Sequence, residues 1–304
     1  MHWILTIPSD FLLSDVIQQS QRFLLPPFQI KQGQLERVEQ LASGKIVAIA
    51  ISQIPTGLYI ETKQRITGSE TEEISQKIRR MLRIGENFSD LLERAAEDPL
   101  LQKYLKRGVR LLRGTTFEED ISKALILGHA PAQGYRYIAQ LVDRLGPTLP
   151  SNPTRHAYPT LDNLLKNSSI TQEALGPEIG QIIIESLSYI KNQAAPFAER
   201  THATVPTEVL KTILNKIPNM NDKALSLIML ALSHYDYVPH DAKVELREGQ
   251  PWYNNDNIPP QTIHSFARWH PWEGLLYWLR ECSEDAPNHL WGKEKKLVHG
   301  NAPN

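Results

Sequence analysis

The stretch that decides the fold runs from Thr207 to Arg247 and reads TEVLKTILNKIPNMNDKALSLIMLALSHYDYVPHDAKVELR. It predicts a helix, a tight hairpin and a second helix, followed by an extended loop and a third helix. Pro218 ends the first helix, because proline has no amide hydrogen to continue the helical hydrogen bonds. Asn219 and Asn221 suit the hairpin, since asparagine is among the residues that most readily take positive φ after glycine. The second helix begins at Asn221 or Asp222.

A hairpin of this kind predicts a phosphate site. Its backbone N–H groups and the N-terminus of the following helix point outward, and both favour an anion. Lys223 lies in the first turn of the second helix, and Asp241 lies in the loop behind Pro239. Taken singly, Lys223 has the ordinary interpretation of a surface lysine and Asp241 that of a helix N-cap. Their occurrence in one helix–hairpin–helix unit makes them candidates for chemistry.

Composition narrows the class of protein. The chain has 304 residues, 41% of them apolar and 22% charged, with a net charge of -1, which is typical of a soluble globular protein. The near-zero charge argues against a generally basic nucleic-acid coat and leaves room for one local basic face. No apolar run is long enough for a membrane helix, and the N-terminus lacks the pattern of a secretory signal.

Cofactor chemistry has little support in the sequence. The single cysteine, Cys282, excludes an intramolecular disulfide framework and Cys-ligated zinc or iron–sulfur sites. His129 and His240 have no second ligand at metal-binding spacing, and no nucleotide-binding glycine motif occurs. We therefore expect neither a metal nor a nucleotide cofactor.

Residues 1–70 predict a small α+β domain. Lys45–Ile51 and Gly57–Glu61 alternate with a period of two, as antiparallel strands do. Ser9–Phe23 predicts a helix with Ser9 or Asp10 as its N-cap.

Residues 71–285 predict a helical domain, because the apolar period changes to that of an α-helix near residue 70. Its helix–hairpin–helix unit covers about residues 207–234. The sequence predicts irregular connections at residues 146–159 and 248–260. It predicts a loosely ordered tail at residues 286–304. The expected helices are 72–82, 88–98, 100–106, 116–127, 132–145, 160–165, 171–175, 176–191, 206–215, 222–234, 260–267 and 272–282. The predicted fold class is mainly α with an N-terminal antiparallel α+β domain.

The hairpin also carries a family resemblance. Ile217–Ala224, followed by Val238–Asp241, resembles the core of the helix-hairpin-helix DNA glycosylase superfamily, in which a Pro-Gly-x-Gly hairpin precedes a helix and a Pro-x-Asp loop. The N-terminal domain suits the 8-oxoguanine and alkylbase branches of that family. Further similar segments bring the coverage to about residues 1–282; they are Gly108–Arg113 with Phe117 and Glu118, Val142–Gly146, and Phe266–Trp272, which is similar to 3-methyladenine DNA glycosylase II.

The resemblance implies catalytic roles. Lys223 matches the lysine with which bifunctional members attack the sugar C1′, and Asp241 matches the aspartate of active members. Cleavage of an N-glycosidic bond develops positive charge on the sugar, which a carboxylate stabilises, while an amine can capture C1′ as a Schiff base. The amine must be neutral to attack, so burial or a helix N-terminus must lower its pKa.

The resemblance also implies DNA contacts. Its DNA-binding candidates are the hairpin residues Asn219 and Asn221, the lysines Lys216 and Lys243, and Gln133 in an interhelical loop. Its base-pocket candidates are Tyr237, Trp269 and Trp272, which as aromatic residues at helix ends also fit a core role. One departure from the family is that both hairpin glycines are asparagines here, which weakens the expected backbone contact to phosphate.

The predicted function is excision of a damaged base, a purine by the resemblance, from double-stranded DNA, with lyase activity at the abasic site. We expect an intracellular monomer without a membrane partner. Three alternatives stay open: a monofunctional alkylbase glycosylase, a non-catalytic protein that binds DNA structures, and a helical interaction protein. The identity of the damaged base, 8-oxoguanine or an alkylated purine, is not readable from the sequence.

Overall fold

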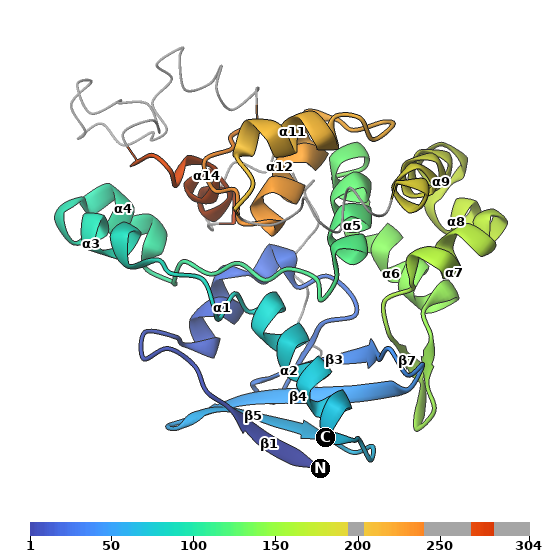
Figure 1. Ribbon diagram of the computed structural model, residues 1–304, viewed down its shortest axis with the longest axis horizontal. Helices are drawn as coiled ribbons and strands as arrows, with labels where there is room; N and C mark the ends of the chain where they lie inside the picture. The colour runs from blue at the N-terminus through green and yellow to red at the C-terminus, as the bar shows by residue number, and fades with distance from the viewer. Residues whose placement is uncertain (194–203, 240–268, 283–304) are drawn as a thin grey trace, which may run out of the picture.

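The computed structural model describes residues 1–193, 204–239 and 269–282. An N-terminal antiparallel sheet lies at one end of the molecule and the helices cover it and extend away from it (Figure 1). The predicted fold class is thereby confirmed. Asp241, Lys243, the expected helix at 260–267, the expected connection at 248–260 and the tail lie outside the described residues.

The N-terminal sheet has five antiparallel strands in the order β1-β5-β4-β3-β2. Its central strand buries Val47, Ile49 and Ile51 on one face, so the strand predicted from the period-two apolar pattern is confirmed. The strands are β1 (His2–Leu5), β2 (Gln29–Lys31), β3 (Gln34–Gln40), β4 (Ile46–Ile54) and β5 (Gly57–Thr62).

The first helix is shorter than its sequence predicted. α1 spans Leu13–Gln19 and is followed by a short 3-10 turn, η1 (Gln21–Phe23). Its N-cap is Leu12, which makes no side-chain cap, so the expected capping by Ser9 or Asp10 is wrong. The amide of Leu13 donates instead to Gln53 Oε1 in β4, at 2.6 Å. A tertiary contact therefore satisfies the helix end that a local cap was expected to satisfy.

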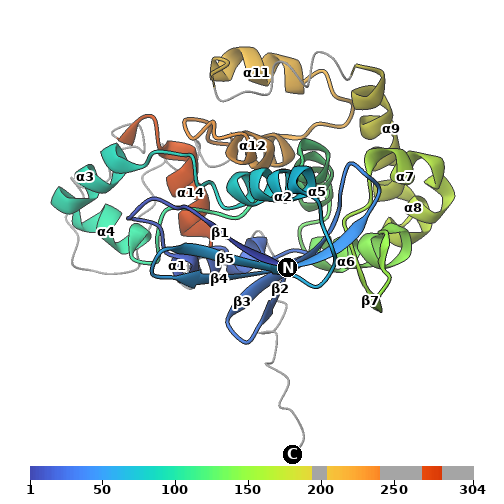
Figure 2. The ribbon, with the colours of Figure 1, turned by 60° about the horizontal axis from the view of Figure 1, so that its bottom comes forward.

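The helix α2 (Gly68–Met81) connects the sheet to the helical part. Thr67 and Glu70 form a reciprocal capping box, so the helix starts before the expected Glu72. Ile74 and Ile78 are buried in the same cluster as the sheet residues. α2 lies between the sheet and α12 in both views (Figures 1 and 2), and the predicted domain boundary near residue 70 falls at its start.

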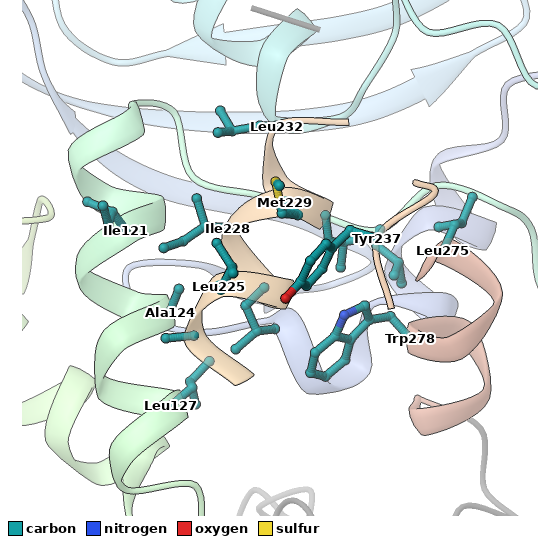
Figure 3. Packing of buried hydrophobic residues seen from close by; sticks show 14 of the residues in the cluster. Ile121, Ala124, Leu127, Leu225, Ile228, Met229, Leu232, Tyr237, Leu275 and Trp278 are labelled. Atoms are coloured by element: carbon teal, nitrogen blue, oxygen red, sulfur yellow. The ribbon is translucent and has the colours of Figure 1, made fainter. Parts of the chain in front are cut away.

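The helical part follows the predicted segments to within a few residues. α5, α12 and α14 pack around one apolar core (Figure 3). None of the described helices is long and apolar enough to cross a membrane. The helices are α3 (Ser89–Glu97), α4 (Pro99–Leu105), α5 (Phe117–His129), α6 (Gly134–Leu145), α7 (Leu161–Lys166), α8 (Ser168–Leu175), α9 (Pro177–Asn192), α11 (Thr207–Leu214), α12 (Asp222–Ala231) and α14 (Glu273–Glu281).

Residues 146–159 are not an irregular connection, as the sequence predicted. They form an antiparallel hairpin of β6 (Thr148–Leu149) and β7 (Asn152–His156), which reaches the sheet (Figure 1). Leu149 is buried with Val38 of β3, and Arg155 pairs with Glu36 at 2.8 Å. The polar, proline-containing sequence suggested a loop, and contact with the sheet stabilises it as a hairpin.

A buried cluster of charges joins the sheet to α5. Arg37 of β3 pairs with Glu119 at 3.0 Å, and Lys123 pairs with the same carboxylate at 2.6 Å. Burial tends to raise the pKa of Glu119, but attraction to Arg37 and Lys123 outweighs it and lowers that pKa below its usual value. The carboxylate is thus held charged in the interior by its two partners.

We expect Glu119→Gln to lower the free energy of unfolding by about 3 kcal/mol at pH 7, because it removes the carboxylate that pairs with buried Lys123 and one of the two that pair with buried Arg37. The pKa of Glu119 is lowered on folding from 4.5, so this stabilisation is present above that value and is lost as the pH falls below it. Urea unfolding from pH 7 to pH 3 measures the effect. Glu118→Gln, at the exposed neighbouring position, is the control. A difference from wild type that does not shrink below pH 4.5 would contradict the assignment.

Candidate functional site

The hairpin between α11 and α12 uses its two asparagines differently. Asn219 has φ 61°, in the left-handed region where glycine is favoured. Asn221 does not take positive φ; it has φ -96° and is the N-cap of α12. Its Oδ1 accepts from the amide of Ala224 at 2.8 Å, as capping asparagines do. One asparagine thus makes the reversal and the other starts the helix.

Three neighbouring groups hold the hairpin in place. The His129 Nε2 lies 2.7 Å from the carbonyl of Asn219, and because a carbonyl only accepts, this nitrogen carries the proton. Ser186 donates to the carbonyl of Pro218 at 2.7 Å. The side-chain amide of Asn219 donates to Glu185 at 2.9 Å, so it turns toward α9. α5 and α9 therefore support the hairpin from outside the motif.

Gly128 permits the closest approach of α5 to the hairpin. A Cβ at this position would lie 2.7 Å from Asn221 Oδ1 and 2.8 Å from the Cβ of Ala224. Any side chain would therefore push α5 away from the start of α12. Sequence reasoning missed this residue and the hairpin contacts of His129, Glu185 and Ser186. The adjacent Gly128 and His129, just before Ala130-Pro131 at a helix end, were the available signal.

Lys223 lies in the first turn of α12 and is half-buried. The preceding residue, Asp222, accepts a hydrogen bond from the hydroxyl of Tyr237 at 2.6 Å. Burial, and then this hydrogen bond, raises the pKa of Tyr237. The start of α12 thus carries the amine of Lys223 next in sequence to the carboxylate of Asp222, which accepts a hydrogen bond from the phenol of Tyr237.

After α12 the chain reverses toward the start of the same helix. The helix ends at Ala231, three residues before the expected His234, and Ser233 takes φ 68°. The amides of Ser233 and His234 donate to the carbonyls of Leu230 and Met229 at 3.2 and 2.9 Å, which is a Schellman ending. The described chain ends at Pro239, so Asp241 and Lys243 lie beyond the described residues.

A buried guanidinium stabilises this reversal. Arg83, 2% exposed, donates to the hydroxyl of Tyr235 at 2.8 Å and to the carbonyl of Leu230 at 2.7 Å. Glu86 accepts from Ser233 at 2.8 Å and from Tyr235. Burial tends to raise the pKa of Glu86, but attraction to Arg83, and then to a second arginine, lowers it. This ion pair balances the backbone strain of a non-glycine residue at positive φ.

The predicted base-pocket residues lie in the core of the helical part. Trp269 and Trp272 are 5% and 8% exposed, and their indole N–H groups donate to Asp98 and Asp90 at 3.1 and 2.9 Å. The ring of Trp272 stacks on Tyr235 with centroids 5.5 Å apart. Tyr237 is also buried, beside α12 and α14 (Figure 3).

A cavity of about 40 Å³ opens between α5 and α12. Leu227 lines it and follows Lys223 by one helical turn, so the cavity lies along the same face of α12 as the amine. Arg113 and Lys123 add positive charge to its wall, and burial followed by repulsion from neighbouring arginines lowers the pKa of Arg113 to about 10. The described lining comprises Phe23, Leu25, Phe28, Arg83, Leu112, Arg113, Gly114, Asp120, Lys123, Ala124, Leu127, Leu227, Leu230 and Ala231.

The remaining predicted DNA contacts are at the surface. Lys216 is exposed just before the hairpin, and Gln133 is exposed at the start of α6. The loop that carries Gln133 begins after His129, so the contact of His129 with Asn219 brings this loop beside the hairpin. No group of His, Cys, Asp and Glu side chains suited to a metal ion occurs in the described part of the chain.

We expect Asn219→Val to destabilise the protein by about 2 kcal/mol, because a β-branched residue strains at positive φ. Asn219→Gly should stay within about 1 kcal/mol of wild type, since glycine adopts this conformation freely. Urea unfolding measures both. Asn215→Val is the matched control, because Asn215 has φ -65° at the end of α11. Equal destabilisation by valine and glycine at position 219 would show that backbone conformation does not govern the hairpin.

No protein-family model matches the sequence, and a search of curated proteins finds no significant match. Solved structures do match. The 3-methyladenine DNA glycosylase from Archaeoglobus fulgidus is 17% identical, with a TM-score of 0.64 over 94% of this chain and 100% of that chain.

The 8-oxoguanine glycosylase/lyase from Clostridium acetobutylicum matches in two structures. Its apo form is 17% identical with a TM-score of 0.64, over 91% of this chain and 98% of that chain. Its complex with double-stranded DNA containing cytosine opposite 8-oxoguanine is 18% identical with a TM-score of 0.63, over 92% and 98%. At these identities the likeness establishes the fold. The chain therefore has the fold of the 8-oxoguanine and 3-methyladenine DNA glycosylases, as the hairpin and the Pro-x-Asp segment predicted.

Proposed function

We propose that the protein is a DNA glycosylase that excises a damaged purine and cleaves the abasic strand with Lys223. The observation that carries this proposal is the return of the chain after Ser233, which brings Tyr237 into contact with Asp222, next to Lys223. Asp241 follows Tyr237 by four residues, which span at most about 14 Å. The reversal therefore supports our proposal that the amine of Lys223 and the carboxylate of Asp241 lie close together at the N-terminal end of α12.

DNA binding follows from the hairpin. The N-terminus of α12 favours a phosphate, and the turn keeps the left-handed conformation at Asn219 that glycine would provide. The Asn219 side-chain amide donates to Glu185, so it turns toward α9. Lys216, exposed just before the hairpin, and Gln133, exposed at the start of α6, are the further DNA contacts that we propose. The substitution of asparagine for glycine is thus compatible with phosphate binding.

The chemistry follows from the two predicted catalytic groups. The neutral amine of Lys223 attacks C1′ while the bond from C1′ to the base breaks, and the base leaves with the electron pair and takes up a proton. Asp241 stabilises the positive charge that develops on the sugar. Opening of the sugar ring gives a Schiff base, and loss of a C2′ proton then eliminates the 3′ phosphate and cuts the strand.

The cavity between α5 and α12 is our candidate for the base pocket. It lies one turn along α12 from Lys223, and its walls combine apolar side chains with cationic ones and with the carboxylate of Asp120. A base flipped out of duplex DNA needs an apolar surface for its faces and polar groups for its edge. The small volume means that its walls must separate when a base enters. Tyr237, Trp269 and Trp272 are not among its described lining residues.

Borohydride trapping tests the proposed activity. Duplexes with 8-oxoguanine, an alkylated purine, uracil or an abasic site are incubated with wild type, Lys223→Gln and Asp241→Asn. We expect wild type to form a covalent adduct with at least one duplex, Lys223→Gln to form none, and Asp241→Asn to lose base release at least 100-fold. Base release without trapping would establish the monofunctional alternative. Binding without release from any duplex would favour a non-catalytic DNA-binding protein.

Salt dependence tests the DNA-binding surface. We expect Lys216→Ala to weaken binding to duplexes of every sequence and to reduce the slope of log K against log salt by about one, because one phosphate contact is lost. Fluorescence anisotropy from 50 to 200 mM salt measures the slope. Lys63→Ala, an exposed lysine after β5 in the sheet, should leave it unchanged. Equal slopes for wild type and Lys216→Ala would show that Lys216 does not contact a DNA phosphate.

A further inference from the structure

We propose that Tyr237 is a positioning residue whose hydroxyl, bound to Asp222, holds the chain leading to Asp241 at a fixed place beside the start of α12. The inference rests on the proposed function, because Lys223 and Asp241 are the groups that it brings together. It assigns to Tyr237 a role different from the base-pocket role that the sequence suggested.

The hydrogen bond closes a loop that begins and ends at α12. Asp222 is the first residue of α12, and Tyr237 follows the reversal at Ser233. Tyr237 lies between α12 and α14, with its hydroxyl directed toward the N-terminal half of α12 (Figure 3). Its oxygen is 2.6 Å from Asp222 Oδ1, in a site where the tyrosine is 6% exposed. A short bond to a carboxylate at a buried site is among the stronger neutral-to-charged hydrogen bonds.

The backbone on the N-terminal side of Tyr237 is fixed by other elements. The amides of Gly274 and Leu275, at the start of α14, donate to the carbonyl of Tyr235 at 2.6 and 3.3 Å. Asp236 accepts from Thr207, the first residue of α11, at 2.7 Å. Gly274 has no room for a side chain, because a Cβ there would collide with the carbonyl oxygen of Tyr237.

These contacts hold Tyr235 and Asp236 in place, and the hydroxyl of Tyr237 makes a separate contact with the start of α12. Tyr235 and Asp236 bind to α14 and to α11, whereas the side chain of Tyr237 binds Asp222, the first residue of α12. It is also the anchor nearest in sequence to Pro239 and Asp241. The hydroxyl therefore sets where the chain leaves the turn relative to Lys223. Small displacements of reacting groups reduce rates strongly, so this contact is expected to affect chemistry more than binding.

Single-turnover base release on the substrate found by trapping tests the inference. We expect Tyr237→Phe to lower the maximal rate at saturating enzyme about tenfold while leaving the duplex Kd unchanged. Asp222→Ala should cause a similar loss. Asp222→Asn, which keeps an oxygen acceptor, should retain at least about half of the wild-type rate. Because both changes remove one bond, the double variant Tyr237→Phe/Asp222→Ala should lose no more than either single variant, within about twofold.

Tyr158→Phe is the matched control, because it removes another phenol hydrogen bond, to Ser122 at 2.7 Å, at a distance from the hairpin along the chain. It should lower Tm about as much as Tyr237→Phe and leave the rate unchanged. A base-release rate of Tyr237→Phe within twofold of wild type would overturn this inference and leave the proposed function standing. The same conclusion would follow if the rate losses of the two single variants multiplied in the double variant. A wild type that releases no base from any duplex would overturn the proposed function and this inference with it.

Discussion

The close contact of α5 with the start of α12 is the constraint on which the arrangement of the site depends. The missing side chain of Gly128 lets α5 approach the capping oxygen of Asn221, and His129 then reaches the carbonyl of Asn219. Because α5 is also bound to the sheet through Glu119, the hairpin is held at a fixed place relative to the N-terminal part. The turn is therefore supported by its surroundings as well as by its own residues, which explains how it keeps its form with asparagines in place of glycines.

Two clusters of buried charged groups, one at each end of the core, also hold parts of the structure at fixed places. Near the sheet, Arg37 and Lys123 neutralise Glu119, and at the far end of α12, Arg83 binds the Leu230 carbonyl and the Tyr235 hydroxyl. Such groups are costly to bury and contribute little net stability when complete, but they tolerate only one geometry. We interpret both clusters as devices that fix orientation: one aligns α5 with the sheet, and the other fixes the direction in which the chain leaves α12.

Much of the fold was predictable, because the helices and strands of this chain have clear apolar periods. The strand at Ile46–Ile54 and the helix at Pro177–Asn192 were recognised from those periods alone. The errors lie where a tertiary contact replaces a local signal. The start of α1 is satisfied by Gln53 rather than by Ser9 or Asp10. Residues 148–156 form a strand hairpin because the sheet offers Val38 as a partner to Leu149 and Glu36 as a partner to Arg155. In the site, the sequence located the hairpin between α11 and α12, and the role of Lys223 stays a prediction. Gly128, Glu185 and Ser186 were missed, because their partners lie far away in the sequence.

The sequence by itself determined the order of the helices, the position of the hairpin and the residue types at its turn, because these depend on local propensities and on the special backbone properties of proline and asparagine. Only the tertiary structure decided which asparagine takes positive φ, where α12 ends, and which side chains face the start of that helix. Ser233 in the left-handed conformation and Tyr237 bound to Asp222 illustrate the difference. Neither follows from neighbouring residues, since both depend on groups that folding brings together from the segment after α2, from α11, from the start of α12 and from α14. The free energy of those contacts outweighs the local preference of the chain.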